Sequence, residues 1–400
     1  MINIAVDSCC PMSVESSGRP RLLIATDWML PRIDGISRFL AAVLPSICED
    51  YAITIIAPDF GPAPSLPAGC NMIRFPVSRI MRFKGYAATL TDAAVVHQQV
   101  RQADAVWVQG TGPIGRSAAR ESVRQDKRLF ATLHAKEWEI VARVLFRQEA
   151  LVNGAGSMLR PVVLRTYDKA SMVMVPHESM VTLVRKAGFL GPALEVVPLG
   201  IDTARFIPSA DRAMAKRAVG LPDDKVVIGY VGRLTPEKNL ALLERAYRRL
   251  LATSVAGRVQ LLLVGSGSSA VTARLSRIPR CKVAGPVPDV VAYLQAIDIF
   301  VHPSFSESTS LSLLEAMSCG AAPVCTDVSV TSRSVVPGVN GHHIDPHDNA
   351  GLAKILAGLV LDPVCLSALQ RRARATALVQ GSWDASVPAL RAALARGMNL

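Results

Sequence analysis

Short apolar runs alternate with longer amphipathic stretches in the first half of this chain. The runs cover 21–26, 52–57, 105–108, 129–133 and 172–175, and Gly, Pro or Asp bound them. Runs of this length predict buried strands, and stretches of helical period between them, such as 36–47, predict helices. Strands alternating with helices are typical of a parallel sheet covered on both faces.

The pattern restarts in the second half, without a close internal sequence repeat. Its apolar runs cover 226–231, 259–264, 299–301 and 322–325. Helices are predicted at 239–251 and 311–317, and from 366 to the end. We therefore predict an α/β protein with two Rossmann-like, doubly wound domains that face each other across a cleft, because ligands bind beyond the carboxyl ends of such strands.

The join is predicted within 198–222, where Pro, Gly and charged residues separate apolar blocks. The predicted organisation is a flexible leader at 1–20, one domain at 21–200, a second at 201–375, and a helix at 376–400 that packs back on the first domain. The leader lacks the pattern of a secretory signal, and no apolar run reaches the ~18 residues of a spanning helix.

A formal net charge of +12 indicates nucleic acid, anionic lipid surfaces or phosphorylated ligands as partners. Lys and Arg are spread along the chain, which disfavours nucleic acid. The eight cysteines include no C-x-x-C pair, so we expect reduced, buried thiols rather than disulfides or a zinc site. That expectation places the protein in the cytoplasm.

The segment Val231–Asn239 has the residues of a phosphate site. Gly232 permits a sharp turn after a predicted strand, and Arg233 and Lys238 put two cations at the mouth of a predicted helix. A solvated loop before a capped helix is an equally good interpretation of this segment alone.

The segment Leu261–Ala270 reads as a strand followed by G-x-G-x-x-A. A dinucleotide fingerprint is similar, but it normally opens its domain and has an acidic residue about 20 positions on. Gly-Pro-Val-Pro at 285–288 stands near that place. We therefore interpret the glycines as a tight turn that packs a helix on the sheet.

Glu307 and Glu315 are separated by seven residues. Glu315 lies in an apolar helical stretch, where a carboxylate needs a partner, and Glu307 lies in a turn rich in helix caps. Carboxylates accept hydrogen bonds from paired hydroxyls, as on ribose or a hexose. An N-terminal helix charge and an ordinary buried pair are the alternative.

Gly35 and His134 are candidates in the first half. Gly35 stands where a loop meets a helix and where backbone amides can approach a phosphate, although a plain turn explains it as well. His134 follows a predicted strand, and taken alone it is better explained as a core histidine.

Together these stretches resemble the family-4 retaining glycosyltransferases (glycosyl transferases group 1), which have the GT-B fold. The shared features are a Gly-rich loop at Gly35, G-R-L-x-x-x-K-N at 232–239, V-G-x-G at 264–267 and E-x7-E at 307–315. His134 falls where that family has an N-domain histidine. The resemblance covers about 21–390.

The resemblance implies an acceptor-side first domain and a second domain that binds the donor. Arg233 and Lys238 would hold the donor diphosphate, and Glu315 the ribose. Glu307 and His134 would contact the transferred sugar. The implied catalytic residues are His134, Arg233, Lys238 and Glu307. The implied donor-binding residues are Gly35, Gly232, Arg233, Lys238, Glu307, Ser310, Leu311 and Glu315.

Two departures leave the donor open. Asp34-Gly35 replaces the family's frequent Gly-Gly, and 307–310 reads Glu-Ser-Thr-Ser in place of E-G-F-G. The chain has no D-x-D pair, so Arg233 and Lys238 are expected to offset the diphosphate charge without a metal or other cofactor. His342, His343 and His347 are interpreted as part of a surface loop.

The implied activity is transfer of a hexose from a UDP- or GDP-sugar, such as GDP-mannose or UDP-glucose, with retention of configuration. The expected acceptor is lipid-linked or membrane-associated, in glycolipid or polysaccharide synthesis. The alternatives are a transferase to a soluble saccharide, an epimerase or hydrolase of this architecture, and a non-enzymatic nucleotide-sugar-binding protein.

Segment 72–86 bears on the membrane. Arg74, Arg79, Arg82 and Lys84 alternate there with apolar residues. This pattern suits the surface of an anionic bilayer, and a strand ending near Val77 before a solvated loop explains it equally well. The net charge favours the first interpretation and a peripheral position at the inner face of the membrane.

Overall fold

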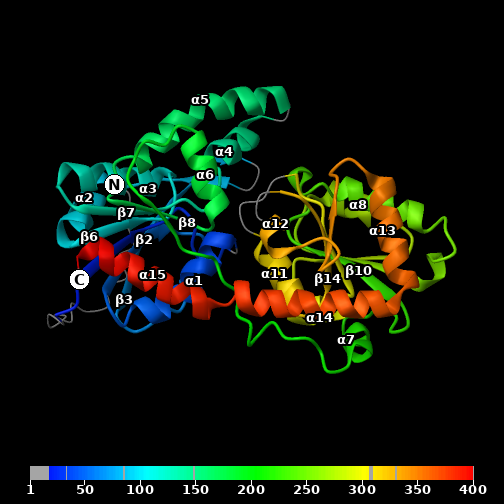
Figure 1. Cartoon of the computed structure of the whole chain (residues 1–400). Coiled ribbons are helices and arrows are strands. Elements are labelled where there is room, and N and C mark those ends of the chain that lie inside the picture. Colours follow the sequence, from blue (N-terminus) through cyan, green and yellow to red (C-terminus); the bar gives the residue numbers. More distant parts are fainter. Residues whose placement is uncertain are drawn as a thin grey trace. The chain divides into compact units, whose positions relative to one another are not determined.

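The computed structural model describes residues 18–32, 34–83, 86–146, 149–305, 310–328 and 331–399. The chain forms two compact units (Figure 1). The first comprises Met1–Pro198 with Ser386–Leu400, and the second comprises Leu199–Ala385.

The first unit is built on a parallel sheet of seven strands in the order β3-β2-β1-β6-β7-β8-β9. The strands are β1 Arg21–Ala25, β2 Ala52–Pro58, β3 Cys70–Phe75, β6 Ala105–Val108, β7 Arg128–Thr132, β8 Met172–Val175 and β9 Leu194–Val196. The helices are α1 Gly35–Ile47, α2 Ala93–Gln102, α3 Pro113–Arg124, α4 Glu137–Leu145, α5 Glu149–Tyr167, α6 Glu178–Lys186 and, from Ser386 on, α15 Trp383–Met398.

The second unit is built on a parallel sheet of six strands in the order β12-β11-β10-β13-β14-β15. The strands are β10 Val226–Val231, β11 Val259–Val264, β12 Cys281–Gly285, β13 Ile299–His302, β14 Ala322–Thr326 and β15 His342–Ile344. The helices are α7 Arg212–Ala218, α8 Leu240–Leu250, α9 Ser269–Leu275, α10 Val291–Ala296, α11 Leu311–Ser318, α12 Thr331–Ser334, α13 Asn349–Leu361 and α14 Pro363–Gln380, with short 3-10 turns η1 Pro236–Lys238 and η2 Ala256–Arg258.

Alternate residues of the central strands fill a core on each face of each sheet. In β6, Val106 and Val108 pack with α2, α3, α5 and α6, whereas Trp107 meets Phe39 of α1 on the other face. In β10, Ile228 and Tyr230 pack with α8 and α13, while Val227 and Val231 pack with α11 and α14. The predicted α/β fold with two doubly wound domains is confirmed.

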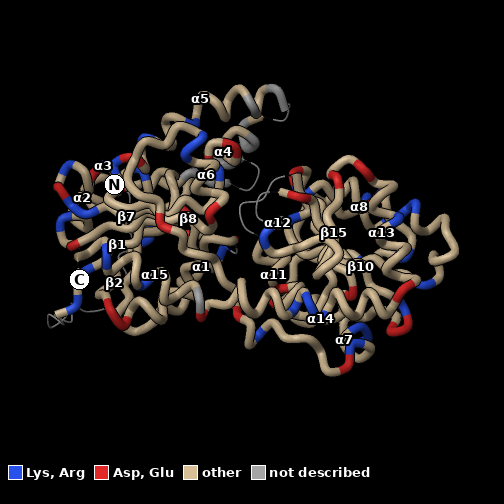
Figure 2. Tube along the Cα trace, viewed as in Figure 1, with Lys and Arg blue, Asp and Glu red and all other residues tan. Residues whose placement is uncertain are grey.

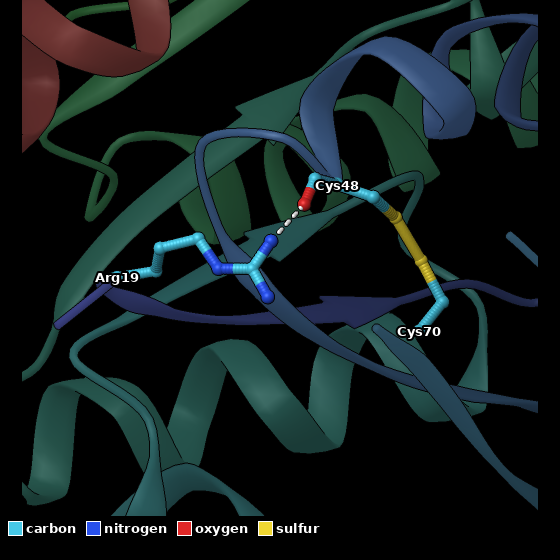
Figure 3. The surroundings of a disulfide bond; sticks show 3 residues. All are labelled: Arg19, Cys48 and Cys70. Carbon is cyan, nitrogen blue, oxygen red and sulfur yellow. Dashed lines mark hydrogen bonds between the residues drawn. A yellow bond between two sulfur atoms is a disulfide. The ribbon is translucent and has the colours of Figure 1, made fainter. Parts of the chain in front are cut away.

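A disulfide joins Cys48, which caps the end of α1, to Cys70, the first residue of β3 (Figure 3). The expectation of reduced, buried thiols is therefore wrong for this pair. β2 follows α1 and pairs with β3, which closes a separation of 22 residues. Arg19 Nη1 also donates to the Cys48 carbonyl at 2.5 Å. Of the free thiols, Cys365 is exposed.

Two local expectations are also corrected. The chain does not enter a loop after Val77, because Val77–Phe83 (β4) forms an antiparallel hairpin with Tyr86–Thr89 (β5). Lys84 and the side chains of Arg79 and Arg82 lie outside the described residues. His342 and His343 are not in a loop, because they form β15 at an edge of the second sheet.

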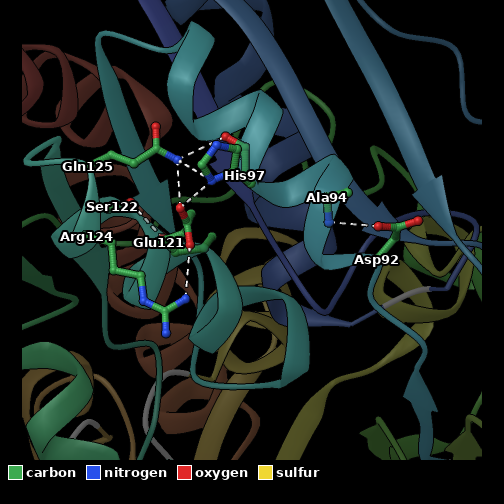
Figure 4. Close-up of polar contacts among 8 residues, drawn as sticks. Asp92, Ala94, His97, Glu121, Ser122, Arg124 and Gln125 are labelled. Carbon is green, nitrogen blue, oxygen red and sulfur yellow. Dashed lines mark hydrogen bonds and ion pairs between the residues drawn. The ribbon is translucent and has the colours of Figure 1, made fainter.

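A polar network ties α2 to α3 (Figure 4). Asp92 caps α2 by accepting from Ala94 N at 2.8 Å. His97 Nδ1 of α2 lies 2.7 Å from Glu121 Oε1 of α3, which also accepts from Gln125 Nε2 at 2.8 Å. The Gln125 hydrogen bond lowers the pKa of Glu121, so the carboxylate is charged. The network therefore holds α2 and α3 together.

Lys and Arg lie on elements of both units (Figure 2). The basic charge is therefore not confined to one segment. Among the described residues, no single helix combines the length and apolar composition needed to cross a bilayer, and only the bent pair α13–α14 passes when its two helices are taken together.

Candidate active site

Two glycine loops pack against each other beyond β10 and β11. Gly232 has φ +151° and Gly265 has φ +137°. A Cβ on Gly265 would overlap the Gly232 carbonyl oxygen, so a side chain there is excluded. Gly232 N donates to Val264 O at 2.9 Å, and Leu234 N donates to Ser266 O at 2.7 Å. The loop that carries Arg233 is thus held by backbone hydrogen bonds.

The second loop is the tight turn that the sequence predicted. Ser268 caps α9 by accepting from Val271 N at 3.3 Å, and α9 then lies against β12. Gly265 N donates to Gly285 O at 2.8 Å. Gly285 is the last residue of β12, close to the position where a dinucleotide-binding fold has its acidic residue.

Arg233 lies in the loop after β10, and Lys238 lies in the 3-10 turn η1 that precedes α8. Lys238 ends the 3-10 turn η1, and Asn239 follows with φ +51° before α8 begins. α8 begins at Leu240, one residue after the predicted start at 239. The Arg233 side chain is 56% exposed, and its Nη2 lies 3.3 Å from Glu237 Oε1. Two cations thus stand at the carboxyl end of β10.

The loop after β13 lies beside these cations. Phe305 N donates to Glu237 O at 3.1 Å, which joins the two loops. Glu307, Ser308 and Thr309 lie outside the described residues. Ser310 caps α11 by accepting from Leu313 N at 3.3 Å.

Glu315 lies one turn into α11, and it is only 1% exposed. Leu311, at the start of the helix, is also buried. β10 and β13 are neighbouring strands of the second sheet. The segments that follow their carboxyl ends therefore lie at the same end of the sheet, and these segments contain Gly232, Arg233, Lys238 and Ser310.

Gly35 starts α1, but the amides beside it already have a partner. Asp34 Oδ1 accepts from Ile36 N and from Ser37 N, each at 2.9 Å, and Asp34 N donates to Ser37 Oγ at 2.9 Å. Burial raises the pKa of Asp34. The carboxylate that replaces a family glycine thus caps the helix end where a phosphate was expected. The contact of Gly35 with the diphosphate stays a prediction.

His134 is buried beyond the end of β7. Its Nε2 lies 2.8 Å from Gln109 Oε1, and its ring meets the edge of Phe39 at 5.3 Å between centroids. Burial lowers the pKa of His134 to about 3. The side chain is therefore a neutral hydrogen-bonding group at physiological pH.

A third glycine loop, which sequence reasoning missed, lies in the first unit and follows β6. Gly110, Gly112 and Gly115 form a G-x-G-x-x-G pattern between β6 and α3. This pattern is visible in the sequence and could have predicted the loop. Asp27 occupies the anion position at this helix start, because its Oδ1 accepts from Ile114 N at 2.9 Å and its Oδ2 from Gly115 N at 3.1 Å. Burial raises the pKa of Asp27 to about 6.

Glu137 holds the same loop from the other side. It accepts from Thr111 N at 2.8 Å, from the Thr111 hydroxyl, and from Tyr167 Oη at 2.5 Å. Burial raises the pKa of Glu137, and burial with the nearby Glu137 charge raises that of Tyr167. These buried groups fix the loop that begins at Gln109.

The described part of the chain contains no group of three or more His, Cys, Asp or Glu side chains that could hold a metal ion. His343 Nδ1 lies 3.9 Å from Asp327 Oδ2, and the His347 ring packs 5.7 Å from that of Phe305. The three histidines near 342–347 therefore have separate surroundings.

Two doubly wound units define a protein of the GT-B class, together with the paired glycine loops and the two cations beyond the carboxyl end of β10. The family model "Glycosyltransferase Family 4" matches residues 33–205, and "Glycosyl transferases group 1" matches residues 225–362. The chain belongs to the group 1, family-4 glycosyltransferases.

Curated relatives include the D-inositol 3-phosphate glycosyltransferases of Corynebacterium jeikeium and Acidothermus cellulolyticus. The first is 35% identical over 212 residues, covering 50% of each chain. The second is 36% identical over 208 residues, covering 48% of this chain and 46% of the relative. The chain thus spans about half the length of the curated relatives it matches.

Solved structures match nearly the whole chain. Sucrose-phosphate synthase of Thermosynechococcus elongatus has a TM-score of 0.73 at 17% identity, covering 94% of this chain and 98% of that one. HepE of Anabaena, in complex with UDP and glucose, has a TM-score of 0.73 at 19% identity, covering 94% and 100%. At such identities the match shows the fold, and the predicted GT-B fold is confirmed.

Proposed function

We propose that this protein is a retaining glycosyltransferase that moves a hexose from a UDP- or GDP-sugar to an acceptor. The observation that carries the proposal is the pair of glycine loops at Gly232 and Gly265, which holds Arg233 at the carboxyl end of β10, with Lys238 in the turn that follows. Structures of HepE contain UDP and UDP-glucose, which supports a nucleotide-sugar donor.

In this proposal the two cations act on the leaving diphosphate. Negative charge develops there as the bond to the sugar breaks, and fixed cations stabilise it without reorganising. Glu315 binds the ribose of the donor, with Ser310 and Leu311 at the helix start beside it. Glu307 holds hydroxyls of the sugar. His134, being neutral, contacts the sugar as a hydrogen-bonding partner.

The proposed acceptor is lipid-linked or membrane-associated, in glycolipid or polysaccharide synthesis at the inner face of the membrane. A second candidate is a soluble phosphorylated polyol, because the curated relatives are named for D-inositol 3-phosphate. The basic chain suits an anionic membrane surface and a phosphorylated acceptor alike.

A transfer assay tests the activity and separates the two acceptors. The protein is incubated with UDP- and GDP-hexoses and either extracted bacterial lipid or D-inositol 3-phosphate, and products are identified by mass spectrometry. Hexosylated lipid supports the proposed acceptor, hexosylated inositol phosphate supports the second, and release of free sugar alone with both acceptors indicates a hydrolase.

Activity is expected to persist in EDTA, with the product keeping the anomeric configuration of the donor. Arg233 and Lys238 supply the positive charge that a divalent ion supplies elsewhere. Initial rates with and without chelator, followed by NMR of the product's anomeric proton, measure both features. Loss of activity in EDTA that manganese or magnesium restores contradicts the metal-free mechanism.

The protein is expected to co-sediment with anionic vesicles at low salt and to be released at high salt. Each cation near such a surface contributes about 1 kcal/mol, so changing Arg79, Arg82 and Lys84 to Glu weakens binding by about 10²-fold or more. Donor affinity should be unchanged in this variant.

A matched variant replaces the exposed α5 side chains Leu151, Met158 and Val162 by serine, which tests apolar contact through another surface. If only the α5 variant loses vesicle binding, segment 72–86 is not the contact. If the wild type ignores anionic vesicles at low salt, the membrane proposal is wrong and a soluble acceptor is favoured.

A further inference from the structure

Gln109 and His134 form a polar pair inside the first unit. Gln109 is the residue after β6 and is fully buried, and His134 lies two residues after β7. Their side chains meet at 2.8 Å, from Gln109 Oε1 to His134 Nε2. The Gln109 backbone is fixed as well, because its N donates to Ala25 O at 2.9 Å.

The amide decides which ring nitrogen carries the proton. In the structure the carboxamide oxygen of Gln109 faces the ring, and because such an oxygen accepts hydrogen bonds and cannot donate, this arrangement requires a proton on His134 Nε2. His134 is neutral because burial lowers its pKa to about 3. A neutral imidazole has one N–H, and Nδ1 is therefore a lone-pair acceptor.

Each partner keeps one buried polar atom without a hydrogen bond to any described residue. These atoms are His134 Nδ1 and Gln109 Nε2, an acceptor and a donor. A buried polar group left unpaired costs about 1–3 kcal/mol, so a purely structural pair would be expected to satisfy both. A hydroxyl, which donates and accepts, matches this chemistry.

We propose that Gln109 is a positioning residue that fixes the Nε2–H tautomer of His134, so that Nδ1 accepts a hydrogen bond from a hydroxyl of the transferred sugar. The identity of that ligand rests on the proposed function, whereas the tautomer does not. The ring is held in place by Phe39 at its edge, and Gln109 is held by the Gly110 turn that Glu137 supports.

Gln109→Leu removes the acceptor at similar volume, and ring-¹⁵N NMR of histidine reads the result directly. The His134 signal is assigned among seven histidines by its loss in His134→Ala. In the wild type we expect Nε2–H alone, and in Gln109→Leu a substantial population of Nδ1–H. Turnover should fall about 10–100-fold, the range typical when a group that orients a metal-binding histidine is lost. In a His134→Ala background, Gln109→Leu should cost nothing further.

Thr132→Val is the matched control. It removes another buried hydrogen bond from the same two segments, Trp107 Nε1 to Thr132 Oγ1 at 2.9 Å, without touching the pair. It should lower the melting temperature and leave the tautomer and turnover unchanged.

Retention of Nε2–H in Gln109→Leu overturns the proposal, as does a turnover equal to that of Thr132→Val. If the wild type transfers no sugar from any donor, the proposed function fails, and the NMR result still decides whether Gln109 sets the tautomer.

Discussion

Arg233→Ala lowers turnover by about 10²–10³-fold, and Lys238→Ala does the same, because each removes a fixed charge from the leaving diphosphate. The fold should survive. Arg233 is 56% exposed and its ion pair with Glu237 spans 3.3 Å at the surface, where such pairs contribute about 0–1 kcal/mol. Initial rates at saturating donor and acceptor, with circular dichroism for folding, measure the two effects.

Arg248→Ala is the matched control for these variants. Arg248 is also half exposed and paired with a glutamate one turn away, with 3.2 Å between Nη2 and Glu244 Oε1. It lies on α8, away from the glycine loops, and its loss should leave turnover unchanged. Near-wild-type rates in both Arg233→Ala and Lys238→Ala would contradict the assignment of the donor site.

Gly265→Ala destabilises the second unit by about 3 kcal/mol or more and removes donor binding. The new methyl group would overlap the Gly232 carbonyl oxygen, and φ +137° is unfavourable for any residue with a Cβ. Because that carbonyl belongs to backbone, the two loops must separate, which displaces Arg233. Chemical denaturation and donor titration measure the two losses.

Gly358→Ala provides the comparison for Gly265→Ala. Gly358 lies on the exposed side of α13, where a Cβ meets nothing within 4 Å. Alanine there should stabilise the helix by up to about 1 kcal/mol. If Gly265→Ala unfolds at the same denaturant concentration as Gly358→Ala and binds donor normally, the close packing of the two glycine loops is not required.

The apolar runs located the strands in the middle of each sheet, because those strands are covered on both faces. The strands without such a signal stand at the edges. β9, β12 and β15 are edge strands whose residues are mostly half-buried, so their sequences lack a continuous apolar run. β3 is also an edge strand, and the sequence placed a strand there as only one of two interpretations.

The residues of the candidate site divide in a similar way, according to how far apart in the sequence the interacting residues lie. Local motifs found Gly232, Arg233 and Lys238, because a turn and its cations are adjacent in sequence. The pairing of Gln109 with His134 spans 25 residues and that of Asp27 with Ile114 spans 87. Only the sheet order brings such partners together, and no spacing rule predicts them.

The central claim is that the second unit binds a nucleotide-sugar donor through Arg233 and Lys238. A thermal-shift titration with nucleoside diphosphates tests it directly, since a ligand at 100 times its dissociation constant adds about 2.7 kcal/mol to the stability of the protein that binds it. We expect UDP or GDP to raise the melting temperature of the wild type and to leave that of Arg233→Ala unchanged at the same concentration. A wild type that responds to neither nucleotide at millimolar concentration contradicts the account.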